Sequence, residues 1–298
     1  MKSKGLFISA HYSFAVVATF FALWLAVFFD AVTEDYFGYI LIITIGILHG
    51  ANDIRLIGHA YKNKTKVRPL ILYVLIVMIT ALAFYFIPAL ALLLFVLLSC
   101  YHFGEQHWVH KMETSGPLQK VFFMIYGIII FSLLFYLNSE ETISVIENIA
   151  QVSLSKSIFA ISALLACLLS LVFVLVFKKG KSIAANWVEE VFLLLLFGLV
   201  FSIASLTWAF AIYFVLWHSI PSLNDQMQLL YGKSNRVNLK SYLKSSWVYY
   251  ISAIIGLGLT LYFLRNQEQL FLSLFFSFLA AITLPHVLVM MKVYNTSD

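Results

Sequence analysis

Ten apolar segments, each about 20 residues long, follow one another along the chain and are separated by short polar connections. A helix needs about 20 mainly apolar residues to cross the hydrocarbon core of a bilayer. The sequence is 62% apolar and 11% charged, whereas soluble domains carry about 25% charged residues. We therefore expect an all-α, polytopic membrane helix bundle that forms one transmembrane domain over residues 1–298. The expected helices cover residues 11–31, 37–59, 69–87, 89–110, 118–137, 157–177, 187–203, 205–230, 246–264 and 269–291.

The least marked boundary lies in the long apolar run 191–217. The run is too long for one span, and residues 202–207 are its only polar interruption, so we divide it there. The longest connection, residues 138–156, is predicted to lie along the membrane interface because its apolar residues recur at helical spacing. These residues are Ile143, Ile146, Ile149 and Val152.

The basic residues indicate the orientation of the chain. With ten helices and an internal N-terminus, all of the 19 Lys and Arg residues except Lys156 and Arg265 fall in inner connections. Such a bias predicts that both termini lie inside. The net charge of +5 follows from this orientation and does not indicate nucleic-acid binding. The first segment lacks a small-residue cleavage site, so we expect it to be retained as a span of the inner, cytoplasmic membrane.

Four histidines lie within the apolar segments, and they are His49, His102, His218 and His286. An ionisable side chain in the hydrocarbon region is costly, and its presence indicates a functional role. Imidazole is also the commonest protein ligand of transition metals. Four such residues on four separate segments therefore predict a metal site.

The depth of these histidines strengthens this prediction. Their helices are the second, fourth, eighth and tenth, and all four are expected to run from outside to inside. At a rise of about 1.5 Å per residue, His49, His102 and His218 share one depth to within about 2 Å, and His286 lies about 6 Å deeper. The ends of a predicted span shift by several residues, and this difference is no larger than such a shift, so all four are expected at one depth. Side chains at one depth on parallel helices can converge on one ion inside a bundle.

Acidic residues follow two of the histidines closely. Asp53 lies one helical turn after His49, and Glu105 lies three residues after His102. Each carboxylate is a candidate acceptor for the ring N–H of a ligand on a neighbouring helix. The alternative is that both lie at the inner interface, solvated or paired with Arg55. For Asp225, which follows His218, we favour the solvated alternative.

The other histidines have weaker signals. We expect His11, His59 and His110 to be solvated near the membrane interface, and His107 is a lesser candidate for a ligand or proton relay. Pro221 is predicted to kink the eighth helix just after His218.

The surroundings of the four histidines bear on the chemistry. Zinc held by neutral histidines would activate water, whereas Fe(II) with open positions would bind O₂. The chain contains 28 Phe, 16 Tyr and 6 Trp, and Leu, Ile and aromatic residues flank the histidines. A dry aromatic cavity favours a long apolar substrate and a reaction with O₂ over hydrolysis.

Four short motifs together carry a resemblance to a known family. They are His49-Gly50-Ala51-Asn52-Asp53, Tyr101-His102-Phe103-Gly104-Glu105, Trp217-His218-Ser219 and Pro285-His286. In this order, the set resembles the Brp/Blh family of membrane β-carotene 15,15′-dioxygenases over nearly the whole chain.

The resemblance implies a non-haem Fe(II) enzyme that cleaves the central double bond of β-carotene with O₂ and forms two molecules of retinal. The retinal would become the chromophore of a light-driven rhodopsin. The polyene would lie in a tunnel that runs from the metal in two directions, and Tyr101, Phe103 and Trp217 are candidates for its walls, although they could equally be helix-packing residues.

His49, His102 and His218 match positions attributed to iron in this family. Many members have a further histidine one turn after the Trp-His pair, and here that position is Ser222. Either His286 supplies the fourth ligand, or three histidines form the site, or the chain is a divergent member with another substrate. The depth argument favours His286.

Two other functions compete with this interpretation. His102, His107 and His110 are spaced like a histidine box of the di-iron desaturases and hydroxylases, but the chain has eight histidines in all and no adjacent pair. A non-catalytic carotenoid-binding or transport protein is the second alternative. We find no internal repeat of the kind that transporters carry.

Overall fold

The computed structural model describes residues 2–60, 67–112, 116–179, 185–263 and 271–296, and every regular element longer than a single bridge in these ranges is helical. The α-helices are α1 (Lys2–Phe28), α2 (Ala31–Leu41), α3 (Ile47–Gly50), α4 (Asp53–Ala60), α5 (Val67–Phe86), α6 (Pro88–Trp108), α7 (Pro117–Leu137), α8 (Ser139–Ala150), α9 (Lys156–Lys179), α10 (Trp187–Ile203), α11 (Leu206–Ile212), α12 (Ile220–Tyr231), α13 (Arg236–Phe263) and α14 (Phe271–Thr296). Two π-helical segments, η1 (Ile42–Gly46) and η3 (Tyr213–Ser219), and the 3₁₀ turn η2 (Val109–Lys111) complete the order.

Eight helical stretches within the described residues are long and apolar enough to cross a membrane. They are Ala31–His59, Val67–Phe86, Pro88–Lys111, Pro117–Leu137, Lys156–Phe177, Leu206–Tyr231, Arg236–Tyr262 and Leu274–Val293. The chain is therefore an all-α membrane protein. Of the two remaining predicted spans, Tyr12–Phe28 is a shorter apolar helix, and α10 has 17 residues with Glu189 and Glu190 in its first turn. The count of ten and the orientation stay predictions.

The long apolar run divides where its polar residues lie. Helix α10 ends at Ile203, and α11 begins after Ser205, whose hydroxyl accepts a hydrogen bond from the backbone N–H of Trp208. Two carboxylates from α2 stabilise the same turn: Glu34 accepts from the backbone N–H of Ser205 at 2.6 Å, and Asp35 accepts from the Ser205 hydroxyl at 2.8 Å. A helix start needs such acceptors because its first N–H groups have no partners within the helix.

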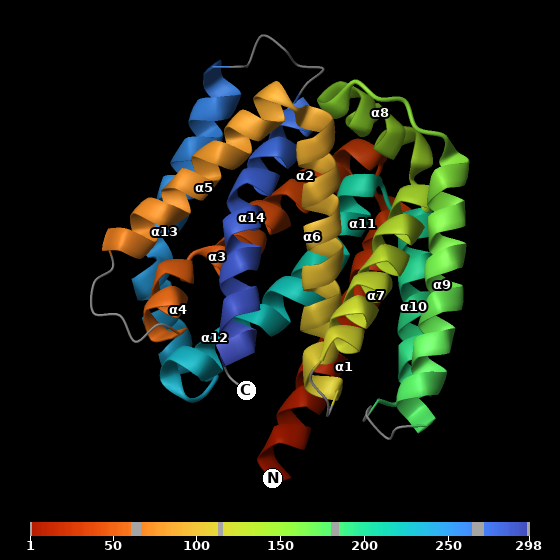
Figure 1. The fold of residues 1–298 in the computed structure, drawn as a ribbon, viewed down its shortest axis with the longest axis horizontal. Coiled ribbons are helices and arrows are strands. Elements are labelled where there is room, and N and C mark those ends of the chain that lie inside the picture. Colours follow the sequence, from red (N-terminus) through yellow and green to blue (C-terminus); the bar gives the residue numbers. More distant parts are fainter. Residues whose placement is uncertain (1, 61–66, 113–115, 180–184, 264–270, 297–298) are drawn as a thin grey trace.

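The connection predicted to lie along the interface contains helix α8. Its apolar residues are buried or half-buried, whereas Ser144, Glu147 and Asn148 are exposed. In Figure 1, α8 crosses the upper end of the bundle beside α6 and α7. This position agrees with an amphipathic helix that covers one end of a membrane domain.

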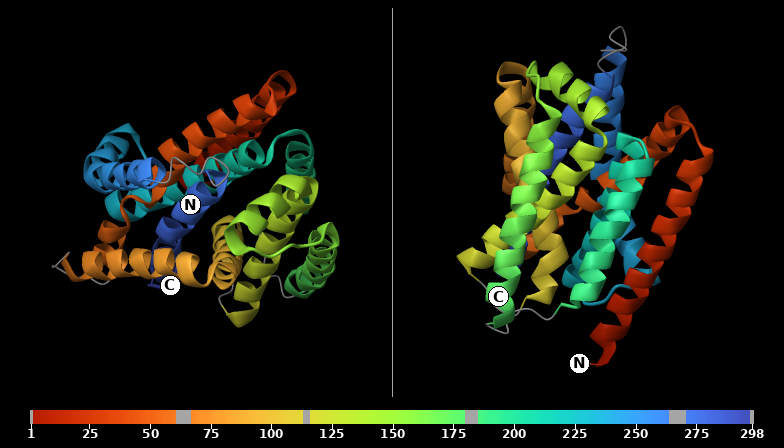
Figure 2. Two further views of the ribbon diagram at one scale, coloured as in Figure 1. Left: turned by 90° about the horizontal axis from the view of Figure 1, so that it is seen from above. Right: turned by 90° about the vertical axis from the view of Figure 1, so that its right-hand side faces the viewer.

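The helices form one bundle with a central group and a periphery (Figures 1 and 2). Helix α6 packs against α7 and α14, α7 packs against α9, and α14 packs against α5. Helix α1 lies at one edge against α10, as the right-hand view of Figure 2 shows. Helices α5 and α9 remain largely exposed on their apolar faces, as expected for surfaces that contact lipid.

The four histidine-bearing stretches run in one direction. In Figure 1, α2 to α4, α6, α11 to α12, and α14 all descend from the upper end of the bundle to the lower end. The start of α1 and the end of α14 both lie in the lower half of the bundle. Because the four stretches run in the same direction, the number of residues from the upper end to each histidine can be compared directly as a depth.

Helices α6 and α7 cross in backbone contact at two glycines. A Cβ on Gly104 would lie 1.9 Å from the carbonyl oxygen of Phe123, and a Cβ on Gly127 would lie 1.8 Å from that of Cys100. Neither position can hold a larger residue without separating the helices. Small residues of this kind commonly set helix spacing in membranes.

We expect Gly127→Ala to destabilise the protein by about 1–3 kcal/mol because the added methyl group overpacks the crossing. Thermal unfolding of the detergent-solubilised protein measures this effect. Gly258→Ala in α13 is the matched control, since a Cβ there has no neighbour within 4 Å. Equal melting temperatures for the two variants would contradict the role of the crossing.

The topology is tested with reporter fusions. A reporter that is active only on the outer side of the membrane should give a signal when it is fused after residue 153, in the connection between α8 and α9. A reporter that is active only in the cytoplasm should give a signal at the C-terminus. An external C-terminus would exclude the ten-helix arrangement with both ends inside.

Candidate metal centre and cavity

Four histidine rings from four helical segments meet inside the bundle. His49 lies in α3, His102 in α6, His218 in η3 and His286 in α14, and all four side chains are buried. The ring centroids are 4.7 Å apart for His49 and His286, 4.8 Å for His102 and His218, 5.3 Å for His49 and His218, and 5.4 Å for His102 and His286. Each ring thus has two of the others as close neighbours.

Two of the rings are held by oxygen acceptors. His49 donates from Nδ1 to the carbonyl oxygen of Gly46, one turn earlier on its own chain. His286 donates from Nδ1 to the Asp53 carboxylate at 2.8 Å, across from α14 to α4. Asp53 in turn accepts a hydrogen bond of 2.9 Å from the Tyr73 hydroxyl of α5. These acceptors fix the tautomer in which Nε2 carries the lone pair.

Six ring nitrogens of the group have no hydrogen-bond partner within the part of the chain that the structure describes. They are Nε2 of His49, both nitrogens of His102, both nitrogens of His218 and Nε2 of His286. Buried polar atoms are rarely left without partners. One ring nitrogen from each of His49, His218 and His286 lies within 4.8 Å of those of the other two.

These features fit a transition-metal ion. Neutral imidazoles supply lone pairs that an ion would satisfy, and the buried Asp53 carboxylate would balance part of its charge. His102 lies outside the tight group of three nitrogens, but its ring is packed against His218 and fully buried. The group is therefore compatible with three or four histidine ligands.

A π-helical segment lies close to His49, and another contains His218. Segment η1 ends three residues before His49, η3 contains His218, and the two segments pack against each other. The Ser219 hydroxyl donates to the carbonyl oxygen of Phe214 at 2.8 Å, five residues earlier. Pro221 follows in the first turn of α12, where it cannot donate a backbone hydrogen bond. π-Helical turns are frequent at functional sites.

A second polar network supports the backbone of His49. The Tyr242 hydroxyl lies 3.0 Å from the carbonyl oxygen of His49 and 2.7 Å from the side-chain oxygen of Gln226. Gln226 donates to the hydroxyl of Ser222 at 3.1 Å. Ser222 is fully buried, so this position is filled by a satisfied hydrogen-bonding group.

Tyr73, Gln226 and Tyr242 were not predicted from the sequence as supporting residues. Each lies in a helix distant in sequence from the histidine that it supports, and single aromatic or amide residues in apolar segments carry no distinguishing spacing. Only Asp53 among these supporting groups had a sequence signal, through its position one turn after His49.

The remaining predicted residues lie elsewhere. Glu105 accepts a hydrogen bond of 2.8 Å from the Tyr101 hydroxyl on the same helix, and no bond from it to a histidine is found among the described residues. His107 contacts Glu190 at 2.7 Å.

Three further histidines were expected to be solvated. His110 contacts Asp225 at 3.1 Å and is exposed, as is His59. The side chain of His11 lies outside the described residues.

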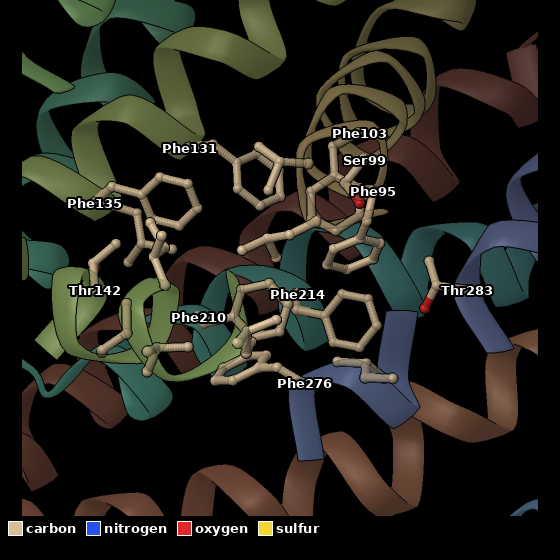
Figure 3. Close-up of a pocket in the computed structure, with 18 residues that line it drawn as sticks. Phe95, Ser99, Phe103, Phe131, Phe135, Thr142, Phe210, Phe214, Phe276 and Thr283 are labelled. Carbon is tan, nitrogen blue, oxygen red and sulfur yellow. The ribbon is translucent and has the colours of Figure 1, made fainter. Parts of the chain in front are cut away.

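An apolar cavity, drawn in Figure 3, lies beside the histidine group. Its walls come from α6, α7, α8, α11, α14 and the first turn of η3. Three lining residues lie three or four positions before a histidine: Ser99 before His102, Phe214 before His218 and Thr283 before His286. The cavity therefore begins about one helical turn from the four rings, on the side towards α8.

Phe103 joins the cavity to the histidine group. Its ring stacks on His218 with centroids 4.2 Å apart, and Phe214 lies 5.5 Å from His49. Of the three predicted tunnel walls, Phe103 lines this cavity, whereas Tyr101 and Trp217 are not among its lining residues. Tyr101 packs against Phe123.

Trp217 faces another part of the bundle. It donates to the Thr19 hydroxyl of α1 at 2.9 Å, and its ring packs against Phe197 of α10. These are helix-packing contacts, the alternative to a role in the tunnel wall.

Comparison with known proteins adds one finding. The model of the beta-carotene 15,15′-dioxygenase family matches residues 40–294, a range that includes all four buried histidines and all of the cavity-lining residues. No curated protein and no solved structure shows a significant match. Because the match covers most of the chain, the protein belongs to the beta-carotene 15,15′-dioxygenase family of oxidoreductases.

Proposed function

We propose that the protein is an Fe(II)-dependent dioxygenase of the inner membrane that cleaves the central double bond of β-carotene with O₂ and releases two molecules of retinal. Each carbon of the cleaved bond receives one oxygen atom. The observation that carries the proposal is the group of four buried histidines with unpaired ring nitrogens, at the end of an apolar cavity, in a chain of this family. The retinal would supply the chromophore of a rhodopsin.

His49, His102, His218 and His286 would hold the iron. Fe(II) with open coordination positions supplies the chemistry that activates O₂. The protein contributes the orientation of the ligands: Gly46 fixes the His49 ring, and Asp53, held by Tyr73, fixes the His286 ring. Outer acceptors of this kind orient imidazoles and raise their basicity.

The cavity would bind the polyene and exclude water from the reacting bond. Phenylalanines are the commonest residues of its lining, and two of them, Phe103 and Phe214, contact the histidine rings. Apolar side chains bind a hydrocarbon by contact with its apolar surface. The same lining keeps water away from the double bond that reacts with O₂. Phe103 and Phe214 lie against the histidine rings and would bring the substrate to them.

The contacts of His286 favour it as the fourth ligand. Its Nδ1 is bonded to Asp53, and its Nε2 has no partner among the described residues. Ser222, where many relatives have a histidine, instead accepts a hydrogen bond from Gln226. The contacts of His107 with Glu190 and of His110 with Asp225 argue against a di-iron site built on the His102–His107–His110 spacing.

We expect His218→Ala to abolish retinal formation and to lower the iron content of the purified protein, because it removes one ligand. His110→Ala is the matched control, since this histidine is exposed and lies outside the group. Product chromatography and elemental analysis measure the two effects, with about one iron per chain expected in the wild type. Two irons per chain would support a desaturase or hydroxylase, and full activity of a folded His218→Ala protein would refute the assignment.

Asp53→Ala should weaken iron binding about 10- to 100-fold, the usual effect of losing the carboxylate partner of a ligating histidine. Tyr73→Phe removes only the outer hydrogen bond and should have a smaller effect in the same direction. Titration of the metal-free protein with Fe(II) under anaerobic conditions measures both. Unchanged affinity in Asp53→Ala would show that His286 needs no such partner.

A further inference from the structure

Helix α8 forms the end of the cavity that lies farthest from the histidines. Four of its residues line the cavity at helical spacing, and they are Thr142, Val145, Ile146 and Ile149. Figure 3 has Thr142 at one side of the cavity, with Phe214 and Thr283, which lie near the histidine group, towards the other. The cavity thus has a histidine end and an α8 end.

The distance between these ends is set by rigid elements. On α6 the lining residues run in one stripe from Leu92 to Phe103, a rise of about 16 Å at 1.5 Å per residue. This is on the scale of half an extended β-carotene molecule. One arm of a symmetric polyene could therefore lie between the histidines and α8.

Helix α8 is fixed to the rest of the bundle at the end where it begins. Asn138 donates from its side chain to the carbonyl oxygen of Phe201 at 3.0 Å, and Glu141 accepts from the backbone N–H of Leu206 at 3.1 Å. Both contacts reach the junction of α10 and α11. Helix α8 also packs against α6, α7 and α14. These contacts favour a fixed wall over a movable lid.

We propose that the cavity face of α8 is the stop that decides which double bond of the carotenoid lies beside the histidines. A conjugated polyene is stiff and cannot fold to take up extra length. When its ring end touches α8, the position of every bond along the arm is therefore determined. This inference rests on the proposed function, because it assumes that a carotenoid occupies the cavity.

The test replaces one side chain on the cavity face of α8 with a larger one. Ile146→Phe adds volume to the cavity face of α8, and Ile143→Phe adds the same volume on the same helix at a residue that does not line the cavity. Ile149→Phe is a second wall variant in case the first fails to fold. Products from β-carotene are separated by chromatography, and carotenoid bound to the iron-free proteins is measured by absorbance.

We expect Ile146→Phe to bind carotenoid and to cleave it away from the centre, giving one longer and one shorter carbonyl fragment. The ratio of retinal to these fragments should fall roughly 10-fold or more, as for other single-group changes in an apolar pocket. Ile143→Phe should form retinal as the wild type does.

The outcomes separate the two proposals. If the wild type forms no retinal, the proposed function fails. If it does, and both folded wall variants still form retinal alone, then α8 is not the stop. Loss of carotenoid binding in both wall variants, with binding kept in Ile143→Phe, would also overturn the inference, because the wall would then exclude the substrate rather than shift it.

Discussion

The structure depends most on the need to satisfy buried imidazole nitrogens in an apolar interior. An unpaired polar atom in such surroundings costs about 1–3 kcal/mol, and six such nitrogens lie together here. A metal ion would satisfy four of them at once. The arrangement of the central helices, the tautomers of His49 and His286, and the buried carboxylate of Asp53 all make physical sense around such an ion.

Backbone packing and backbone geometry both help to position the histidines. The glycine crossing of α6 and α7 fixes α6, which carries His102 and a long stripe of the cavity wall. The π-helical segments near His49 and His218 change the direction of the following side chains relative to a regular α-helix. Together these features let four side chains from distant parts of the chain meet. The apolar cavity begins about one helical turn from them.

The polar residues of the bundle divide between two tasks. Glu34, Asp35 and Glu141 satisfy the helix start after α10, and Asp53, Tyr73 and Tyr242 support the histidines. The first group holds α8 and α11, which bound the cavity. The second group holds the rings at its other end. A mutation in either group is therefore expected to act on the site without touching a substrate.

The sequence alone determined the all-α membrane class, the helix break near residue 204, the amphipathic α8 and the family, because these follow from local hydropathy and short motifs. It also predicted that His49, His102, His218 and His286 share one level, since a constant helical rise converts spacing into depth. Only the tertiary structure decided that Asp53 pairs with His286 while Glu105 pairs with Tyr101, and that Phe103 lines the cavity while Trp217 packs against Phe197. Such choices depend on how each helix is rotated about its axis and on which neighbour it meets, and helix packing across the whole bundle sets both.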